Sequence, residues 1–196
     1  MKAAITRTDS ALILAGGKGA RIGYDKKELV LDGVRVIDKL IGALRTSFDQ
    51  LIVSSNTPFE REGVVTVHDE LGAGPLAGIF SALKVCTSEY LYVTACDMPF
   101  ISLEYIEKLK EIILQHDVEA VVTRRKDGFL EPFNAFYKAS CADTIREQLA
   151  AGEYKIGYLL KKLNLHIIDA VSEDMFFNIN YREDLDDAQL RRMMGG

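Results

Sequence analysis

The sequence has few of the residues that build metal cages or disulfide frameworks. Its 196 residues include three cysteines and three histidines. The cysteines (Cys86, Cys96 and Cys141) form no Cys-x-x-Cys pair, and the histidines complete no zinc-ligand spacing. These patterns argue against a disulfide framework and a structural zinc site. We therefore expect three reduced thiols in a cytoplasmic protein.

The sequence also lacks long apolar runs and a surplus of positive charge. No stretch approaches the roughly 18 apolar residues of a membrane-spanning helix, and the apolar stretch 11–15 is too short for a signal peptide. We therefore expect no membrane partner. The formal net charge is −5, whereas nucleic-acid binders usually carry a basic surplus. We also expect no nucleic-acid partner.

Short β-rich runs alternate with amphipathic stretches, most regularly over the first 123 residues. This alternation is typical of a three-layer α/β/α fold with a mostly parallel, Rossmann-like sheet. The predicted strands are 10–15, 50–54, 64–68, 90–95, 120–123, 133–137 and 166–169. The predicted helices are 36–44, 76–85, one capped by Ser102 with its apolar face from Tyr105 to Ile113, 139–150, 155–162 and 181–194. No repeat or long linker interrupts the chain, so residues 1–196 predict a single domain with two lobes.

A glycine-rich, basic segment follows the first predicted strand directly. Its glycines allow backbone N–H groups to approach phosphate oxygens closely. Four cations and one acid give it a local charge of +3 within an acidic chain, from Lys18, Arg21, Asp25, Lys26 and Lys27. In open α/β sheets, ligands bind at the carboxyl ends of the strands. The segment therefore predicts a phosphate-binding loop.

Two common phosphate loops do not match this segment. A Walker loop needs Gly-Lys followed by Ser or Thr, but Gly17-Lys18 is followed by Gly19. The dinucleotide fingerprint G-x-G-x-x-G needs its third glycine at Ile22, and the glycine comes one residue late, at Gly23. A dehydrogenase is thus a weak alternative.

The segment from Leu14 to Lys26 resembles the L-A-G-G-x-x-x-R-x-G-x-D-K signature of the nucleotidyltransferase family that includes molybdenum cofactor guanylyltransferase. The resemblance continues in further segments along nearly the whole chain. It implies a fold of the nucleotide-diphospho-sugar transferase type. It also implies a nucleotide-binding half at about 10–123 and an acceptor-binding half at about 124–196. In the loop it assigns nucleotide contacts to Leu14, Ala15, Gly16 and Gly17, and phosphate contacts to Arg21 and Lys26.

Asp97 directly follows the predicted strand 90–95 and Cys96. A carboxylate at the carboxyl end of a strand, opposite a phosphate loop, is well placed to hold Mg²⁺. The segment Cys96-Asp97-Met98-Pro99-Phe100 resembles the C-D-x-P-F segment of the same family. We therefore expect Asp97 to bind Mg²⁺ and nucleotide and to act in catalysis with Arg21 and Lys26.

A third group of candidates follows two other strands. Asp69 and the downstream Gly74-Pro75-Leu76-Ala77-Gly78 resemble the D-x-x-x-x-x-G-P-L-A-G segment of the family, in which the aspartate helps to hold the nucleotide. On that match Asp69, Gly74 and Gly78 are nucleotide-binding candidates, although turn geometry and helix packing also explain the glycines. Ser54 and Asn56 stand at another strand end and are candidates to contact the base, with Ser54 where the family often has asparagine.

The acceptor half carries the weaker candidates. The segment 177–185 resembles the family's F-x-N-[IV]-N-T-x-E-D-L, which makes Asn178 and Asn180 acceptor-binding candidates and Asn180 a possible second metal ligand. Asn180 also suits a helix cap, and both interpretations stay open. Pro132 fits the family's Q-P-L-x-A-L-Y, but Glu131 places an acid where a neutral or basic residue is usual.

The resemblance implies transfer of GMP from GTP to molybdopterin cofactor with Mg²⁺, release of pyrophosphate, and delivery to a molybdoenzyme or its chaperone. Cytidylyl transfer to the same cofactor, or nucleotidyl transfer to another phosphorylated acceptor, is the nearest alternative. A non-enzymatic alternative is a nucleotide-binding adaptor that delivers the cofactor. The base preference depends on few contacts, and the residues alone leave it open.

Overall fold

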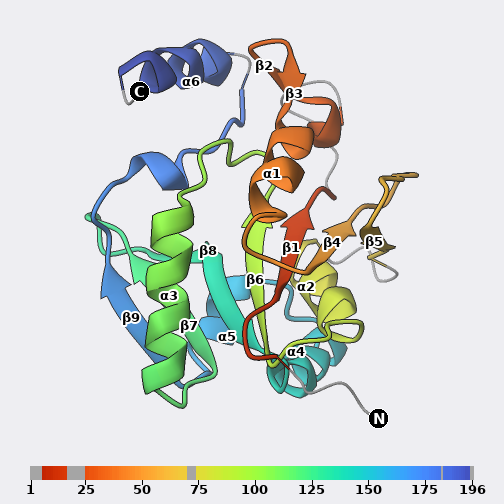
Figure 1. Ribbon diagram of the computed structural model, residues 1–196. Coiled ribbons are helices and arrows are strands. Elements are labelled where there is room, and N and C mark those ends of the chain that lie inside the picture. The colour runs from red at the N-terminus through yellow and green to blue at the C-terminus, as the bar shows by residue number, and fades with distance from the viewer. Residues whose placement is uncertain (1–5, 17–24, 70–73, 182, 195–196) are drawn as a thin grey trace.

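The centre of the fold is a seven-stranded sheet (Figure 1). The computed structural model describes residues 6–16, 25–69, 74–181 and 183–194. Across the sheet the strands are β5 (Val64–Val67), β4 (Gln50–Ser54), β1 (Ser10–Leu14), β6 (Tyr90–Ala95), β8 (Leu130–Lys138), β7 (Ala120–Arg124) and β9 (Leu165–Asp169). Strands from both sides of residue 124 in the sequence belong to this sheet, so both predicted lobes share it.

Six of these strands run in one direction, and β8 runs against its neighbours. β1 pairs in parallel with β4 and β6, β4 pairs in parallel with β5, and β7 pairs in parallel with β9. β8 is antiparallel to both β6 and β7. The expectation of a mostly parallel sheet is confirmed, and β8 is the exception among these seven strands.

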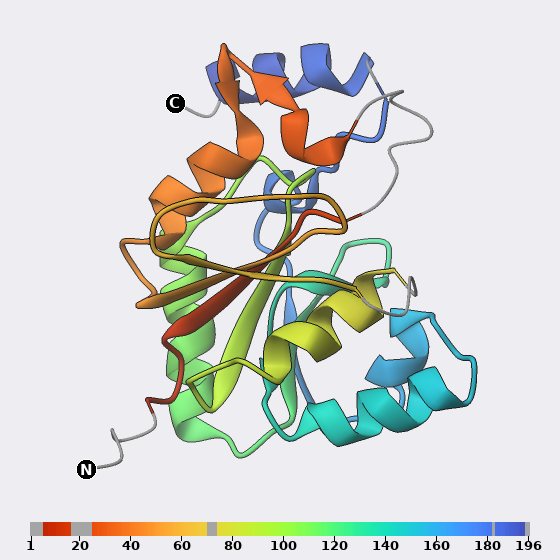
Figure 2. The same cartoon turned by 90° about the vertical axis from the view of Figure 1, so that its right-hand side faces the viewer.

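Helices cover both faces of the sheet, as expected for three layers. Figure 2 shows α1 (Val36–Leu44) and α3 (Leu103–Gln115) on one face. α2 (Pro75–Leu83), α4 (Cys141–Ala150) and α5 (Ile156–Leu160) cover the other face. The last helix, α6 (Glu183–Met194), lies beyond the end of the sheet, beside the hairpin strand β2 (Val30–Leu31) (Figure 1).

The local sequence explains these elements. β1 and β6 are mostly apolar and are buried along their whole length, as central strands must be. Helix α1 buries five apolar residues at helical spacing, namely Val36, Ile37, Leu40, Ile41 and Leu44. Ser102 caps α3, as predicted, by accepting a hydrogen bond from the Tyr105 backbone N–H at 3.2 Å. Pro75 opens α2, where its missing N–H is harmless.

The element boundaries differ from the predictions mainly in the second half. The predicted strand 133–137 begins earlier, at Leu130, and the predicted helix 155–162 is limited to Ile156–Leu160. The helix predicted from residue 181 begins at Glu183. Within the described ranges, no helix is both long enough and apolar enough to cross a membrane. The three cysteines are free, and Cys96 and Cys141 are buried.

A small hairpin was not predicted from the sequence. β2 pairs in antiparallel fashion with β3 (Val34–Arg35), so that only Asp32 and Gly33 form the turn. Both residues have positive φ, 54° and 76°. A two-residue turn with both central residues in the left-handed region is the Asp-Gly hairpin signal, so the information was present in the sequence.

Candidate active site

The carboxyl ends of three parallel strands meet at one edge of the sheet. In the strand register, Leu14 lies beside Ser54 on one side and beside Ala95 on the other. The pairing continues past the strand ends, because Ala15 N donates to Ser54 O at 2.8 Å and Cys96 N donates to Leu14 O at 3.0 Å. The residues that follow β1, β4 and β6 are therefore held side by side, where ligands bind in open α/β sheets.

Two of the predicted catalytic residues meet at this edge. Asp97 follows β6 by two residues, and Lys26 opens a short 3₁₀ helix (Lys26–Glu28) at the end of the glycine-rich segment. The Lys26 ammonium forms an ion pair with Oδ2 of Asp97. The side chains are 26% and 10% exposed, so the pair is sheltered but still reachable by a ligand. Residues 71 positions apart thus place a cation and a carboxylate together.

The neighbouring Lys27 contacts different groups. Its Nζ donates to Pro58 O at 3.0 Å and to Thr57 Oγ1, and it lies 3.5 Å from Oδ2 of Asp25. Asp25 also accepts a hydrogen bond from the Thr57 hydroxyl at 3.0 Å. The Lys27 side chain is largely buried by these contacts. Lys27 therefore fastens the end of the glycine-rich segment to the connection between β4 and β5.

Asp69 forms hydrogen bonds with Asn56, which follows β4, and with Gly74, which precedes helix α2. Its backbone N–H donates to Asn56 Oδ1 at 3.2 Å, and its Oδ2 accepts from the Gly74 N–H at 3.0 Å. Gly74 precedes α2 with φ of 73°, in the left-handed region that favours glycine. Both residues thus have clear structural roles here, and their contact with a nucleotide stays a prediction.

Gly78 and Ser54 pack helix α2 against the sheet. A Cβ on Gly78 would lie 2.7 Å from Leu14 Cδ2 and 2.8 Å from Ser54 Oγ. Ser54 is only 2% exposed. Close approach to the sheet therefore accounts for Gly78, and nucleotide contacts by Gly78, Ser54 and Leu14 remain predictions.

Asn56 is the exposed polar side chain at the end of β4. Its Nδ2 lies 3.9 Å from the position that a Cβ on Gly16 would take, and its Oδ1 binds Asp69 N. Asn56 thus lies between two predicted nucleotide contacts. Its position after a strand had made it a candidate for contact with the base together with Ser54, which stands where the family often has asparagine.

The segment with the two asparagines reaches Asp97 through its backbone. Ile179 is fully buried, and its N–H donates to Asp97 O at 2.8 Å. Asn178 and Asn180, which flank it, are half-buried. The Asp184 carboxylate accepts from the Asn180 and Tyr181 N–H groups at 2.7 and 2.8 Å. The distant segment that the resemblance singled out therefore lies beside Asp97, whereas acceptor or metal binding by the two asparagines stays a prediction.

The first residues of β8 are buried beside the same region. Pro132 accepts a hydrogen bond from the Tyr137 hydroxyl at 2.8 Å through its carbonyl oxygen. Glu131 is 3% exposed, and burial, with a smaller contribution from the negative charge of Asp97, raises its pKa to about 7. A carboxyl with this pKa is mostly protonated, and therefore neutral, at pH values about one unit lower. In that form Glu131 resembles the neutral residue that the family usually has at this position.

Two of the predicted loop residues, Gly17 and Arg21, lie outside the described residues. Among the residues that are described, no three His, Cys, Asp or Glu side chains are arranged to hold a metal ion. Asp97 supplies one carboxylate at the predicted position. Mg²⁺ commonly binds proteins through one or two carboxylates and completes its shell with water and substrate phosphates, so this donor set is compatible with it.

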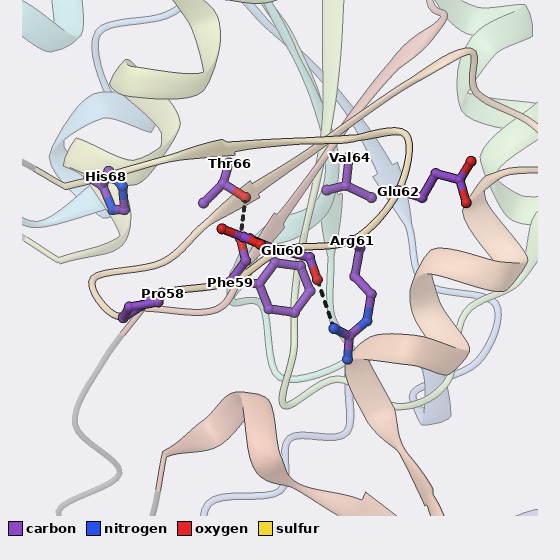
Figure 3. Close-up of a pocket in the computed structure, with 8 residues that line it drawn as sticks. All are labelled: Pro58, Phe59, Glu60, Arg61, Glu62, Val64, Thr66 and His68. Atoms are coloured by element: carbon purple, nitrogen blue, oxygen red, sulfur yellow. Dashed lines mark hydrogen bonds between the residues drawn. The ribbon is translucent and has the colours of Figure 1, made fainter.

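A separate groove of about 660 Å³ lies along the edge strand β5 (Figure 3). It is lined by Pro58, Phe59, Glu60, Arg61, Glu62, Val64, Thr66 and His68. None of the predicted site residues that the structure describes lines it, although His68 directly precedes Asp69. The two glutamates disfavour a triphosphate by like-charge repulsion, so the groove is not assigned to the nucleotide phosphates.

Comparison with known proteins identifies the family of the chain. The MobA-like NTP transferase domain matches residues 11–167. The chain belongs to this family. It is 39% identical to the molybdenum cofactor guanylyltransferase of Syntrophotalea carbinolica, covering 90% of this chain and 89% of that protein. It is 36% identical to the probable molybdenum cofactor guanylyltransferase of Peptoclostridium acidaminophilum, covering 90% and 86%.

Solved structures share the fold. Molybdopterin-guanine dinucleotide biosynthesis protein A from Archaeoglobus fulgidus superposes with a TM-score of 0.81 at 25% identity, over 94% of this chain and 99% of that chain. The 2-C-methyl-D-erythritol 4-phosphate cytidylyltransferase from Thermus thermophilus has a TM-score of 0.71 at 15% identity, over 94% and 98%. The second likeness concerns the fold alone, and it shows that one architecture serves transferases named for different nucleotides.

Proposed function

We propose that the protein transfers GMP from GTP to the phosphate of molybdopterin cofactor and releases pyrophosphate. The observation that carries the proposal is the Lys26–Asp97 pair at the joined ends of β1 and β6, in a chain of the MobA-like family. The guanylyl assignment follows the names of the relatives, which are 39% and 36% identical over 90% of the chain.

The reaction requires positioning and charge neutralisation more than proton transfer. An oxygen of the acceptor phosphate forms a bond to the α-phosphorus of GTP, and the bond from that phosphorus to the bridging oxygen of pyrophosphate breaks. The acceptor phosphate is already ionised, so no strong general base is needed. Lys26 and Arg21 neutralise charge on the triphosphate and on the leaving pyrophosphate.

Asp97 is the residue that would hold Mg²⁺, with Asn180 as a candidate second ligand, and bound Mg²⁺ would polarise the α-phosphate. In the structure the Lys26 ammonium already binds one Asp97 oxygen. This contact orients the carboxylate and keeps a second cation at the point where the triphosphate would enter. With Mg²⁺ bound, the charge of the two cations would exceed that of Asp97, and the site could accept a ligand with several negative charges.

In this proposal, GTP and the molybdopterin acceptor bind on different sides of Asp97. The half formed by residues 10–123 binds GTP through Leu14, Ala15, Gly16, Gly17, Asp69 and their neighbours. The half formed by residues 124–196 binds the molybdopterin acceptor, with Pro132, Asn178 and Asn180 as candidates. A molybdoenzyme or its chaperone is the expected recipient of the product.

A pyrophosphate-release assay tests this function. We expect turnover with Mg²⁺, molybdopterin cofactor and GTP, and much less with CTP in place of GTP. Faster release with CTP would contradict the guanylyl assignment. GTP binding without pyrophosphate release under any of these conditions would favour the cofactor-delivery adaptor instead.

A further inference from the structure

The buried Asn134 in strand β8 has a backbone conformation that few residues adopt. It is 2% exposed and has φ of 48°. The pairing of β8 with β7 explains this conformation, because the register passes from Val121↔Phe136 to Thr123↔Glu131. β8 therefore contains three more residues than β7 between these pairs and forms a bulge that includes Asn134. Asparagine tolerates the left-handed region better than most residues.

The side chain of Asn134 forms hydrogen bonds with groups on both sides of it. Its Oδ1 accepts hydrogen bonds from the Tyr92 hydroxyl at 2.9 Å and from the Thr94 hydroxyl at 2.8 Å, both on β6. Its Nδ2 donates to Met175 O at 2.6 Å. A carbonyl oxygen can only accept, so the amide nitrogen must face Met175 and the amide oxygen must face the hydroxyls. The orientation of the side chain is thereby fixed.

Met175 begins the segment that reaches Asp97. It lies in the short 3₁₀ helix Asp174–Phe176, and four residues later the Ile179 N–H donates to Asp97 O. Tyr92 and Thr94 lie on β6, and Asp97 follows this strand. A closed path thus runs from β6 through Asn134 to Met175, along the chain to Ile179, and back to Asp97.

We infer that Asn134 is a positioning residue, which holds segment 175–180 against Asp97 and so sets the place of Asn178 and Asn180. The inference rests on the proposed function only where it concerns the acceptor. The path does not include the glycine-rich segment, Asn56 or Asp69. Losing Asn134 is therefore expected to affect the acceptor more than the binding of GTP.

The test compares Asn134→Gly with Tyr92→Phe. Glycine accepts the positive φ but loses the bond to Met175, whereas Tyr92→Phe removes one bond from the same buried network and keeps the bond to Met175. In amide hydrogen exchange, we expect Ile179 to exchange about tenfold faster in Asn134→Gly and almost unchanged in Tyr92→Phe. In kinetics, we expect kcat/KM for molybdopterin to fall about 10- to 100-fold in Asn134→Gly, with a smaller change in the KM for GTP.

Asn134→Asp is the second variant, because it keeps the size and the tolerated φ, and its ionised carboxylate cannot donate to Met175 O. It should reproduce the faster exchange of Ile179. Equal exchange of Ile179 in Asn134→Gly and Tyr92→Phe at equal loss of Tm would overturn the inference, as would a larger effect on the KM for GTP than on the acceptor. If the wild-type protein released no pyrophosphate, the proposed function would fail, and the exchange comparison would still decide the role of Asn134.

Discussion

The nucleotide side and the acceptor side of the site reach Asp97 in different ways. On the nucleotide side, β1, β4 and β6 are parallel neighbours in register, so their carboxyl ends coincide. On the acceptor side, β8 runs in the opposite direction with a bulge, and segment 177–181 has no regular secondary structure. The first side is assembled by sheet topology, and the second by particular side-chain contacts, such as the bond of Asn134 with Met175 and the burial of Phe176 and Ile179.

This difference indicates where each side is vulnerable. Backbone pairing over whole strands depends little on any single side chain, whereas a segment held by particular side-chain contacts depends more on each of them. Substitutions on the acceptor side are therefore expected to displace site residues, and those on the nucleotide side to remove either a chemical group or a packing contact.

The largest effect is expected at Asp97, where the two sides meet. Asp97→Asn keeps the shape of the side chain and the backbone oxygen that binds Ile179, but it removes the charge that would hold Mg²⁺. We expect the Mg²⁺-dependent rate of pyrophosphate release to fall about 10³-fold, with little change in Tm. Asp143→Asn, which alters an exposed pair with Arg146 on α4, is the control and should leave the rate unchanged. A near-normal rate in Asp97→Asn would show that the metal binds elsewhere.

The next largest effect separates two adjacent lysines on the nucleotide side. Lys26→Met should lower kcat/KM about 100-fold, because it removes the cation beside Asp97. Lys27→Met should instead lower the free energy of unfolding by about 1–3 kcal/mol, because Thr57, Pro58 and Asp25 lose a buried partner. Pyrophosphate release and thermal unfolding of both variants check this. A loss of stability in Lys26→Met together with a loss of kcat/KM in Lys27→Met would contradict the geometry.

Much of the nucleotide side could be predicted from the sequence for a physical reason. Parallel strands buried on both faces are compact apolar runs, and the residue after such a run lies at the edge where ligands bind. Asp97 and the glycine-rich segment were predicted in this way, whereas Asp69 was predicted from the family resemblance at the end of a strand. The sequence did not distinguish Lys26 from Lys27 by physical reasoning, because which of two adjacent lysines faces Asp97 depends on the 3₁₀ turn that contains them.

The acceptor side was less readable because its geometry depends on contacts between distant residues. Nothing local to 130–138 states that β8 runs antiparallel between β6 and β7, or that Asn134 occupies a bulge. The Met175 partner of Asn134 is 41 residues away. The family resemblance identified the segment around Asn178 and Asn180, whereas the contacts that hold it at Asp97 required the structure.

A smaller effect on the acceptor side concerns pH. Burial raises the pKa of Glu131 to about 7 from its ordinary value of 4.5, so the unfolded chain releases this proton at lower pH than the folded one. Glu131 consequently lowers the free energy of unfolding as pH rises from about 4.5 through 7. Glu131→Gln removes the titrating group and with it this loss of stability. Its effect on the free energy of unfolding should therefore be more favourable at about pH 8 than at about pH 5, by about 1–3 kcal/mol. Denaturant unfolding at both pH values measures it, and an equal effect at the two would contradict the raised pKa.

The smallest effect tests packing on the nucleotide side with two helical glycines. Gly78→Ala should lower the free energy of unfolding by about 1–2 kcal/mol, because its Cβ would meet Leu14 and Ser54 and these side chains must shift. Gly42 on α1 is exposed and has no atom within 4 Å of a built Cβ, so Gly42→Ala should stabilise the protein by about 0.5–1 kcal/mol. Thermal unfolding of both variants gives the signs. If Gly78→Ala were as stable as wild type but lost the Tm increase that GTP produces, nucleotide contact rather than sheet packing would account for this glycine.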